Sequence, residues 1–234
     1  MKILVVNSCG KAKQAAFPTQ AQLQDLQTRD QIRQYVQKHQ DKAIAARYLY
    51  TGQQASKISK AIKILRDTGH EVEYFIISAG LGLLTENQLV PSYEVTFSGL
   101  GKSAILQRSK MLQINSSLEK EIAGKYYDLI YLALGKDYLL PLALENFRHI
   151  ASLVVHFDRS DEFLTEPFFQ VNDSEIIGKD GNIAEFTSPI GNLVQSKGSI
   201  LLNYAQFIQD QGTIEFDEWW INVLNSLQSP LKNH

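Results

Sequence analysis

The sequence predicts an α/β protein with a mostly parallel central sheet flanked by helices, followed by a C-terminal hairpin and a helical extension. Three observations lead to this fold class. Apolar, β-branched runs of strand length recur along the first 160 residues. Stretches with apolar residues at helical spacing separate these runs, and polar or glycine-containing loops follow them. Buried strands that alternate with amphipathic helices are typical of a parallel sheet.

The predicted strands are continuous apolar runs, as expected for strands that are buried on both faces of a sheet. We predict four central strands, at Lys2–Asn7, Glu71–Ser78, Tyr127–Leu134 and Ala151–Phe157. Each of them ends in a short polar or glycine-containing segment. Because ligands usually bind at the carboxyl ends of parallel strands, these segments are the first candidates for a functional site.

Helices are predicted from apolar residues that recur at helical spacing. The clearest one begins at Gln54 and ends at Asp67, before Gly69, a C-terminal capping residue. Further helices are expected at Gly101–Ile122, through Leu140 and Leu144, at Gly198–Gln209 and in a last segment that carries Phe216, Trp219 and Trp220.

Two segments differ from this alternation. Residues 20–40 are rich in glutamine and poor in apolar residues, which indicates surface helices or a partly mobile insertion. Ser174–Phe186 contains Lys179-Asp180-Gly181 between apolar runs, and this predicts a hairpin. No domain boundary is evident. We expect one α/β domain, 1–234, with a core of about 1–160 and a C-terminal extension of about 161–234.

Composition excludes several classes of protein. The chain has 234 residues, a net charge of -2 and a single cysteine, Cys9. An intramolecular disulfide and a cysteine-based zinc module are therefore impossible. No run approaches the roughly 20 apolar residues of a membrane span, so we expect a cytoplasmic protein with no membrane partner. The near-neutral charge disfavours a protein that coats nucleic acid, although a local basic patch remains compatible with it.

Generic motifs for cofactors and metals are incomplete. Gly101-Lys102-Ser103 resembles the end of a phosphate-binding loop but lacks the upstream glycine, and Gly80-x-Gly82 lacks the third glycine of a dinucleotide fingerprint. His156 and Asp158 have no third metal ligand at a recognisable spacing. We expect no cofactor and no metal.

An ordered set of short blocks is more informative. The blocks are Ser8-Cys9-Gly10-Lys11-Ala12-Lys13, Ala46-Arg47-Tyr48-Leu49-Tyr50-Thr51-Gly52, Ile76-Ile77-Ser78-Ala79-Gly80-Leu81-Gly82-Leu83-Leu84 and Val90-Pro91-Ser92-Tyr93. Their order resembles that of the YaaA-like superfamily, which includes peroxide-stress proteins and uncharacterised bacterial and phage domains. Weaker similarities cover Leu132–Tyr138 and Ser196–Ile208. The sequence departs from the pattern in Gly80-Leu81, in Ser92 and in the glutamine-rich insertion.

Three of the similar segments, which begin at Ser8, Ile76 and Leu132, lie at the carboxyl ends of predicted parallel strands, so they should converge on one cleft. The candidate ligand-binding residues are Ser8, Cys9, Lys11, Lys13, Tyr50, Ser78, Gly80, Gly82, Pro91 and Tyr93. Hydroxyl and ammonium donors without a carboxylate base favour an anion or a purine edge as the ligand. The glycines would let backbone N–H groups approach it closely. Cys9 is either a thiol activated by Lys11 or a small packing residue.

The resemblance implies a role connected with nucleic acids. One hypothesis is a protein that binds a nucleotide or a base, or that binds and modifies it. The Ser8/Lys11 block is distantly similar to that of archaeosine synthases, which act on a deazaguanine base in tRNA. The alternative hypothesis is a non-enzymatic, DNA-binding stress-response protein, as the superfamily resemblance implies. The sequence leaves the substrate, the reaction and the oligomeric state open.

Overall fold

The computed structural model describes residues 1–14, 18, 20–157, 166–171 and 193–228. Within these residues a mixed six-stranded sheet has the order β10-β9-β8-β1-β4-β5. All its neighbouring pairs are parallel except β4–β5. The strands are β1 (Lys2–Ser8), β4 (Glu71–Ser78), β5 (Gly82–Thr85), β8 (Tyr127–Ala133), β9 (Ala151–His156) and β10 (Phe168–Gln170).

This sheet confirms the predicted α/β class. The four predicted central strands all form and lie parallel to one another, with ends that differ from the prediction by at most one residue. Ile3, Leu4, Val5 and Val6 of β1 are fully inaccessible to solvent, as expected of a strand covered on both faces. The predicted hairpin at Ser174–Phe186 lies outside the described residues.

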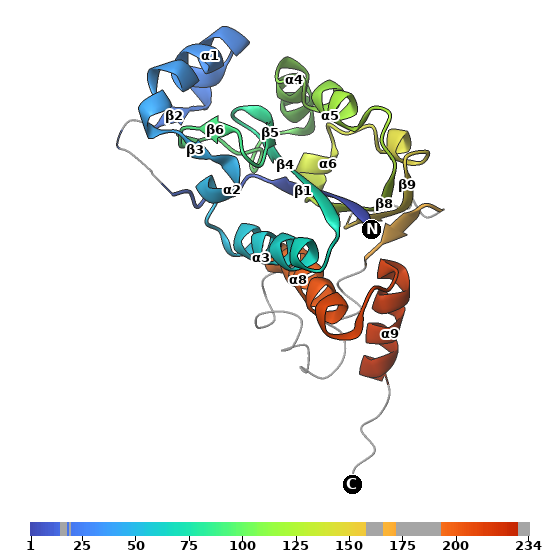
Figure 1. Ribbon diagram of the computed structural model, residues 1–234. Helices are drawn as coiled ribbons and strands as arrows, with labels where there is room; N and C mark the ends of the chain where they lie inside the picture. Colours follow the sequence, from blue (N-terminus) through green and yellow to red (C-terminus); the bar gives the residue numbers. More distant parts are fainter. Residues whose placement is uncertain (15–17, 19, 158–165, 172–192, 229–234) are drawn as a thin grey trace.

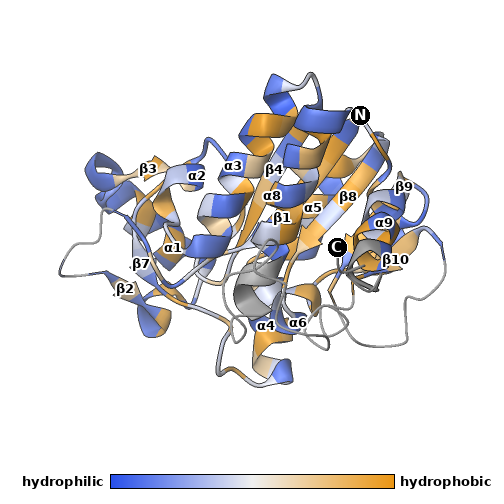
Figure 2. Cartoon of the chain, turned by 90° about the horizontal axis from the view of Figure 1, so that it is seen from below, coloured by the Kyte–Doolittle hydropathy of each residue, from blue (hydrophilic) through white to orange (hydrophobic). Residues whose placement is uncertain are grey.

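Helices cover both faces of the sheet. Figure 1 shows α3 and α8 on one face and α4, α5 and α6 on the other. The α-helices are α1 (Arg29–Lys38), α2 (Ala46–Leu49), α3 (Gln53–Asp67), α4 (Lys102–Met111), α5 (Ile114–Ile122), α6 (Lys136–Leu139), α8 (Leu193–Gln211) and α9 (Phe216–Gln228). In the view of Figure 2, apolar residues line the strands and the inner faces of the helices, where the core lies. None of the helices in the described residues has the length and apolarity needed to cross a bilayer.

The helices α3 and α8 pack closely, although 140 residues separate their starts. Gly198 of α8 allows this approach, because a Cβ atom there would lie 2.8 Å from the carbonyl oxygen of Gln54. The C-terminal helices therefore pack against the same sheet as the N-terminal strands.

The segment between β1 and α3 carries the glutamine-rich stretch. It contains α1 and the 3-10 helices η1 (Leu23–Leu26) and η2 (Gln40–Lys42). Two small sheets tie it to the loop after β5: β2 (Ala21–Gln22) pairs with β7 (Tyr93–Glu94), and β3 (Ile44–Ala45) pairs with β6 (Leu89–Val90). These pairings hold the block around Tyr50 beside the block around Tyr93.

The prediction of one long helix over Gly101–Ile122 is wrong. The structure has two helices, α4 and α5, that meet at Gln113, which adopts a left-handed backbone conformation (φ 54°). The amide oxygen of Gln113 accepts a hydrogen bond from Arg29 Nη1 at 2.7 Å. The turn directs Ile114 and Leu118 of α5 into the core, which a straight continuation of α4 would not do. The short helix expected through Leu140 and Leu144 is split into α6 and the 3-10 helix η3 (Leu144–Phe147).

Candidate functional site

The order of the parallel strands locates the expected ligand-binding end of the sheet. Numbered along the chain, the five parallel strands have the spatial order 2-1-3-4-5, so the connections reverse direction between β1 and β8. Open α/β sheets bind ligands outside the carboxyl ends of their strands at such a point. Here Gln54 of α3 fills the gap, because its Nε2 donates to Asn7 Oδ1 at 2.7 Å and to the Ala133 carbonyl at 3.0 Å.

Beside this point, a group of buried hydroxyls and a thiol lies over the ends of β1 and β4. We call it the tyrosine cluster; its members are Cys9, Lys13, Tyr50, Ser78, Tyr93 and Tyr138. The hydroxyls of Tyr50 and Tyr93 are 2.6 Å apart, and Tyr93 lies 2.5 Å from Ser78 Oγ. Cys9 Sγ contacts the Tyr138 hydroxyl at 3.2 Å. The cluster therefore joins four segments that are distant in sequence.

The hydrogen bonds of Ser78 set the direction of the hydroxyl chain. Its Oγ accepts hydrogen bonds from the backbone N–H groups of Gly80 (3.2 Å) and Leu81 (2.8 Å). With both lone pairs occupied, the Ser78 hydroxyl donates to Tyr93, and Tyr93 in turn donates to Tyr50. In this direction Tyr50 accepts from Tyr93, so the hydroxyl hydrogen of Tyr50, which also lies close to Ser78, is the last donor of the chain.

The tyrosine hydroxyls of the cluster stay protonated. Burial raises the pKa of Tyr50 and of Tyr93 well above the usual value, and the proximity of Cys9 adds to both shifts. The pKa of Tyr138 is raised in the same way, first by burial and then by Cys9. At neutral pH the three side chains therefore act as neutral hydrogen-bond donors.

Lys13 supplies the positive charge of the cluster. Its ammonium lies 4.7 Å from the centre of the Tyr93 ring and 6.0 Å from that of Tyr50. A backbone bridge between Lys13 and Tyr50 holds it there. Burial lowers the pKa of Lys13, while the nearby Cys9 and Glu94 act in the opposite direction. An ammonium over two aromatic faces, beside the terminal hydroxyl donor, is suited to holding an anion.

The predicted site residues separate into two groups. Cys9, Lys13, Tyr50, Ser78, Gly80 and Tyr93 come together in or against the tyrosine cluster. The others lie around it. Ser8 is half-buried at the end of β1, opposite Ile77; Lys11 is exposed; Gly82 begins β5; and Pro91 is buried between β6 and β7.

The two glycines make room for protein atoms. A Cβ atom on Gly80 would lie 2.6 Å from two ring atoms of Tyr93. Gly82 adopts a φ of 92° and lies against the Leu112 carbonyl. At Gly80 the absent side chain therefore accommodates the Tyr93 ring, whereas the sequence suggested the approach of a ligand.

Two functional candidates were not singled out from the sequence. Tyr138 contacts Cys9. It directly follows Gly135-Lys136-Asp137, the segment after β8, and this position is the one sequence feature that could have indicated a role in the site. Gln54 links β1 to β8, but a glutamine in the first turn of a helix carries no such signal. Among the described residues, no three histidine, cysteine, aspartate or glutamate side chains lie close enough to hold a metal ion.

One family model matches the chain over residues 32–158, more than half of its length, and its description is "Family of unknown function (DUF6884)". The chain belongs to the DUF6884 family. The DUF6884 match includes Tyr50, Ser78, Tyr93 and Tyr138 of the tyrosine cluster, whereas Cys9 and Lys13 precede it. No curated protein matches the sequence.

Proposed function

We propose that this DUF6884 protein binds a nucleotide, or a base within a nucleic acid, at the tyrosine cluster. The observation that carries the proposal is the position of Lys13, whose ammonium lies over Tyr93 beside the terminal hydroxyl of Tyr50. A phosphate or an acidic base edge would pair with the ammonium and accept the Tyr50 hydroxyl hydrogen.

Two further points support this function. The cluster lies at the carboxyl ends of β1 and β4, next to the reversal of strand order where such sheets bind ligands. The resemblance of the Ser8, Tyr50, Ser78 and Tyr93 blocks to the YaaA-like superfamily points to nucleic-acid-related chemistry. Within the cluster the charged groups are basic, and the carboxylate of Glu94 lies on the exposed side of β7.

The test is a calorimetric titration with the common nucleoside monophosphates, using wild type and Lys13→Met. Methionine keeps most of the apolar stem but removes the charge, so nucleotide affinity should fall about tenfold or more. The melting temperature should stay at or slightly above that of wild type, because the desolvation that lowers the Lys13 pKa opposes the charged form. Lys120→Met, at an exposed position on α5, is the matched control and should change neither quantity.

A second variant separates the hydroxyl from the charge. Tyr50→Phe removes the terminal donor, together with the acceptor of the Tyr93 hydroxyl, and should weaken nucleotide binding while Lys13 remains. Unchanged affinity in both variants would overturn the proposal. Binding that is confined to duplex DNA, with a steep dependence on salt, would instead indicate a DNA-binding protein that recognises the phosphate backbone.

A further inference from the structure

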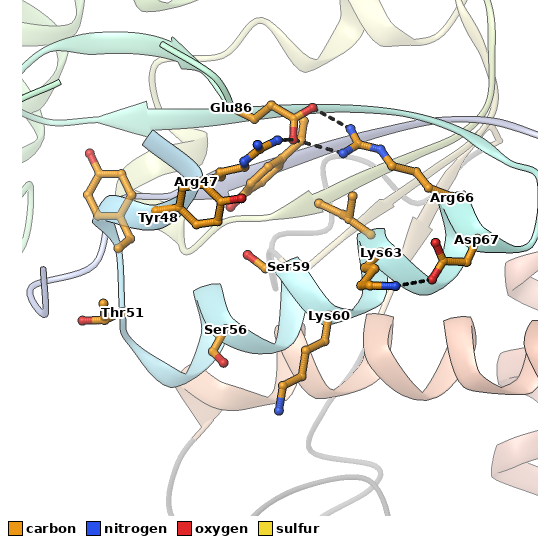
Figure 3. A pocket seen from close by; sticks show the side chains of 13 residues that line it. Arg47, Tyr48, Thr51, Ser56, Ser59, Lys60, Lys63, Arg66, Asp67 and Glu86 are labelled. Atoms are coloured by element: carbon orange, nitrogen blue, oxygen red, sulfur yellow. Dashed lines mark hydrogen bonds and ion pairs between the residues drawn. The ribbon is translucent and has the colours of Figure 1, made fainter. Parts of the chain in front are cut away.

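Besides its place in the tyrosine cluster, Tyr50 lines a groove of about 620 Å³ between α2 and α3. Figure 3 shows its two walls. Arg47, Tyr48 and Glu86 form the upper wall, and the lower wall is the α3 helix, from which Ser59 and Arg66 point toward them. The groove has the volume of an ordinary small-ligand site.

The groove is basic although the protein as a whole is slightly acidic. Its lining includes Arg47, Lys60, Lys63 and Arg66, against two carboxylates, Asp67 and Glu86. The whole chain has a net charge of -2. An excess of cations in one groove of such a protein attracts anions to that place.

Arg47 has hydrogen-bonding capacity that the protein does not use. Arg66 Nη2 donates to Glu86 Oε1 and to the Val72 carbonyl, both at 2.6 Å. Arg47 Nη1, in contrast, lies 3.6 Å from Glu86 Oε2, and the buried Nε of Arg47 has no acceptor among the described residues. Because this Nε is buried, a ligand oxygen in the groove would meet the Nη groups of Arg47, whose ion pair is the 3.6 Å contact with Glu86.

Tyr48 adds an exposed aromatic face. Its side chain is 58% exposed, and the Arg47 guanidinium lies 4.7 Å from the centre of its ring. An exposed tyrosine stacked with an arginine is a surface on which bases stack irrespective of sequence, with the guanidinium near their phosphates.

Tyr50 connects the two places. Its side chain belongs to the lining of the groove, and its hydroxyl is the terminal donor of the tyrosine cluster. Each side of Tyr50 therefore offers one cation beside a second group: Lys13 beside the Tyr50 hydroxyl, and Arg47 beside the exposed Tyr48 ring. Two such pairs match two linked nucleotides, whereas a free mononucleotide would occupy only one.

We propose that the groove binds the neighbouring nucleotide of a single-stranded nucleic acid whose base is held at the tyrosine cluster. This proposal rests on the proposed function and identifies its ligand as a single-stranded nucleic acid. Tyr48 stacks on the second base, and Arg47 donates to the linking or flanking phosphate.

The test compares mononucleotides with single-stranded dinucleotides and hexanucleotides, as both DNA and RNA, by fluorescence anisotropy and calorimetry. The strands should bind wild type at least about fivefold more tightly than mononucleotides do, as expected for one more stacked base. Tyr48→Ala should remove this gain and leave the mononucleotide affinity unchanged. Tyr126→Ala is the matched control, because Tyr126 is 56% exposed and lies outside the groove lining.

Arg47→Lys keeps the charge but removes the planar donors, so it should reduce strand affinity and spare mononucleotide affinity. Strands that bind no more tightly than mononucleotides, or a Tyr48→Ala variant that keeps the full gain, would overturn the inference while the proposed function stands. If neither mononucleotides nor strands bind, both proposals fail. A gain seen with only RNA or only DNA supports the inference and identifies the strand.

Discussion

The tyrosine cluster and the groove share Tyr50 but differ in how their polar groups are satisfied. In the cluster, the hydroxyls of Ser78, Tyr93 and Tyr50 bond to one another in a single direction and are buried. In the groove, Tyr48 is exposed and Arg47 keeps an unpaired donor. For the proposed function this difference predicts a division of roles: a rigid cluster that positions one ligand group, and a groove that can adapt and draw in a charged chain.

Alkaline pH should lower the stability of the folded protein through its buried tyrosines, including those of the cluster. Burial raises the pKa of Tyr50 and Tyr93, and it raises that of Tyr74, next to Asn7, to about 12. Below pH about 10 these tyrosines are neutral in the folded and the unfolded chain; above it only the unfolded chain loses protons, so stability falls. Each such tyrosine contributes about 1.4 kcal/mol per pH unit up to its raised pKa. Urea unfolding at a series of pH values measures this, and stability that is constant up to pH about 11 would contradict it.

Gly80→Ala should be the most harmful single substitution at the cluster. The new methyl group would meet the fully buried Tyr93 ring, which has no space to move, at a cost of about 3 kcal/mol. Gly10→Ala, in the loop after β1, is the control, because the nearest atom to its new Cβ atom would be 3.9 Å away. Denaturant titration of both variants gives the comparison. Equal midpoints for the two would mean that the ring is not fixed.

Tyr93→Phe should cost about 2 kcal/mol, because it leaves the Ser78 hydroxyl without its acceptor in a buried place. Tyr126→Phe also loses one hydrogen bond, to Ser152 Oγ, but that bond is exposed and its loss should cost less than about 0.5 kcal/mol. The same denaturant titration distinguishes them. A cost at Tyr93 as small as that at Tyr126 would show that the hydroxyl chain adds little rigidity.

Of these substitutions, Glu86→Gln should lower stability the least, and it should raise the affinity for a nucleic-acid strand. It weakens ion pairs with half-exposed arginines, at a cost of about 1 kcal/mol or less. It also frees Arg47, so strand affinity should rise about twofold to fivefold. Glu121→Gln makes the same charge change at an exposed position of α5 and should not raise affinity. Equal gains in both variants would indicate a general charge effect instead of a local one.

The central sheet could be predicted because its strands are long apolar runs whose burial on both faces leaves a strong signal. The break between α4 and α5 could not, because Gln113 is not a residue that marks a left-handed turn and its bond to Arg29 joins distant segments. Six of the ten predicted site residues meet: Cys9, Lys13, Ser78 and Gly80 lie at the ends of the neighbouring strands β1 and β4, and the two small sheets bring Tyr50 and Tyr93 to them. The groove had no sequence signal, since its ion pairs join Arg47, Arg66 and Glu86 across three elements.

The central position of β1 also decides which part of the chain can fold independently. β1 bonds to β4 on one side and to β8 on the other, so it joins the two halves of the sheet. The segment that the family shares, 32–158, begins after β1. A fragment cut at those limits would expose two sheet edges where β1 belongs and would lack Lys13. Similarity in this family thus outlines a recognisable core that is smaller than the cooperative folding unit.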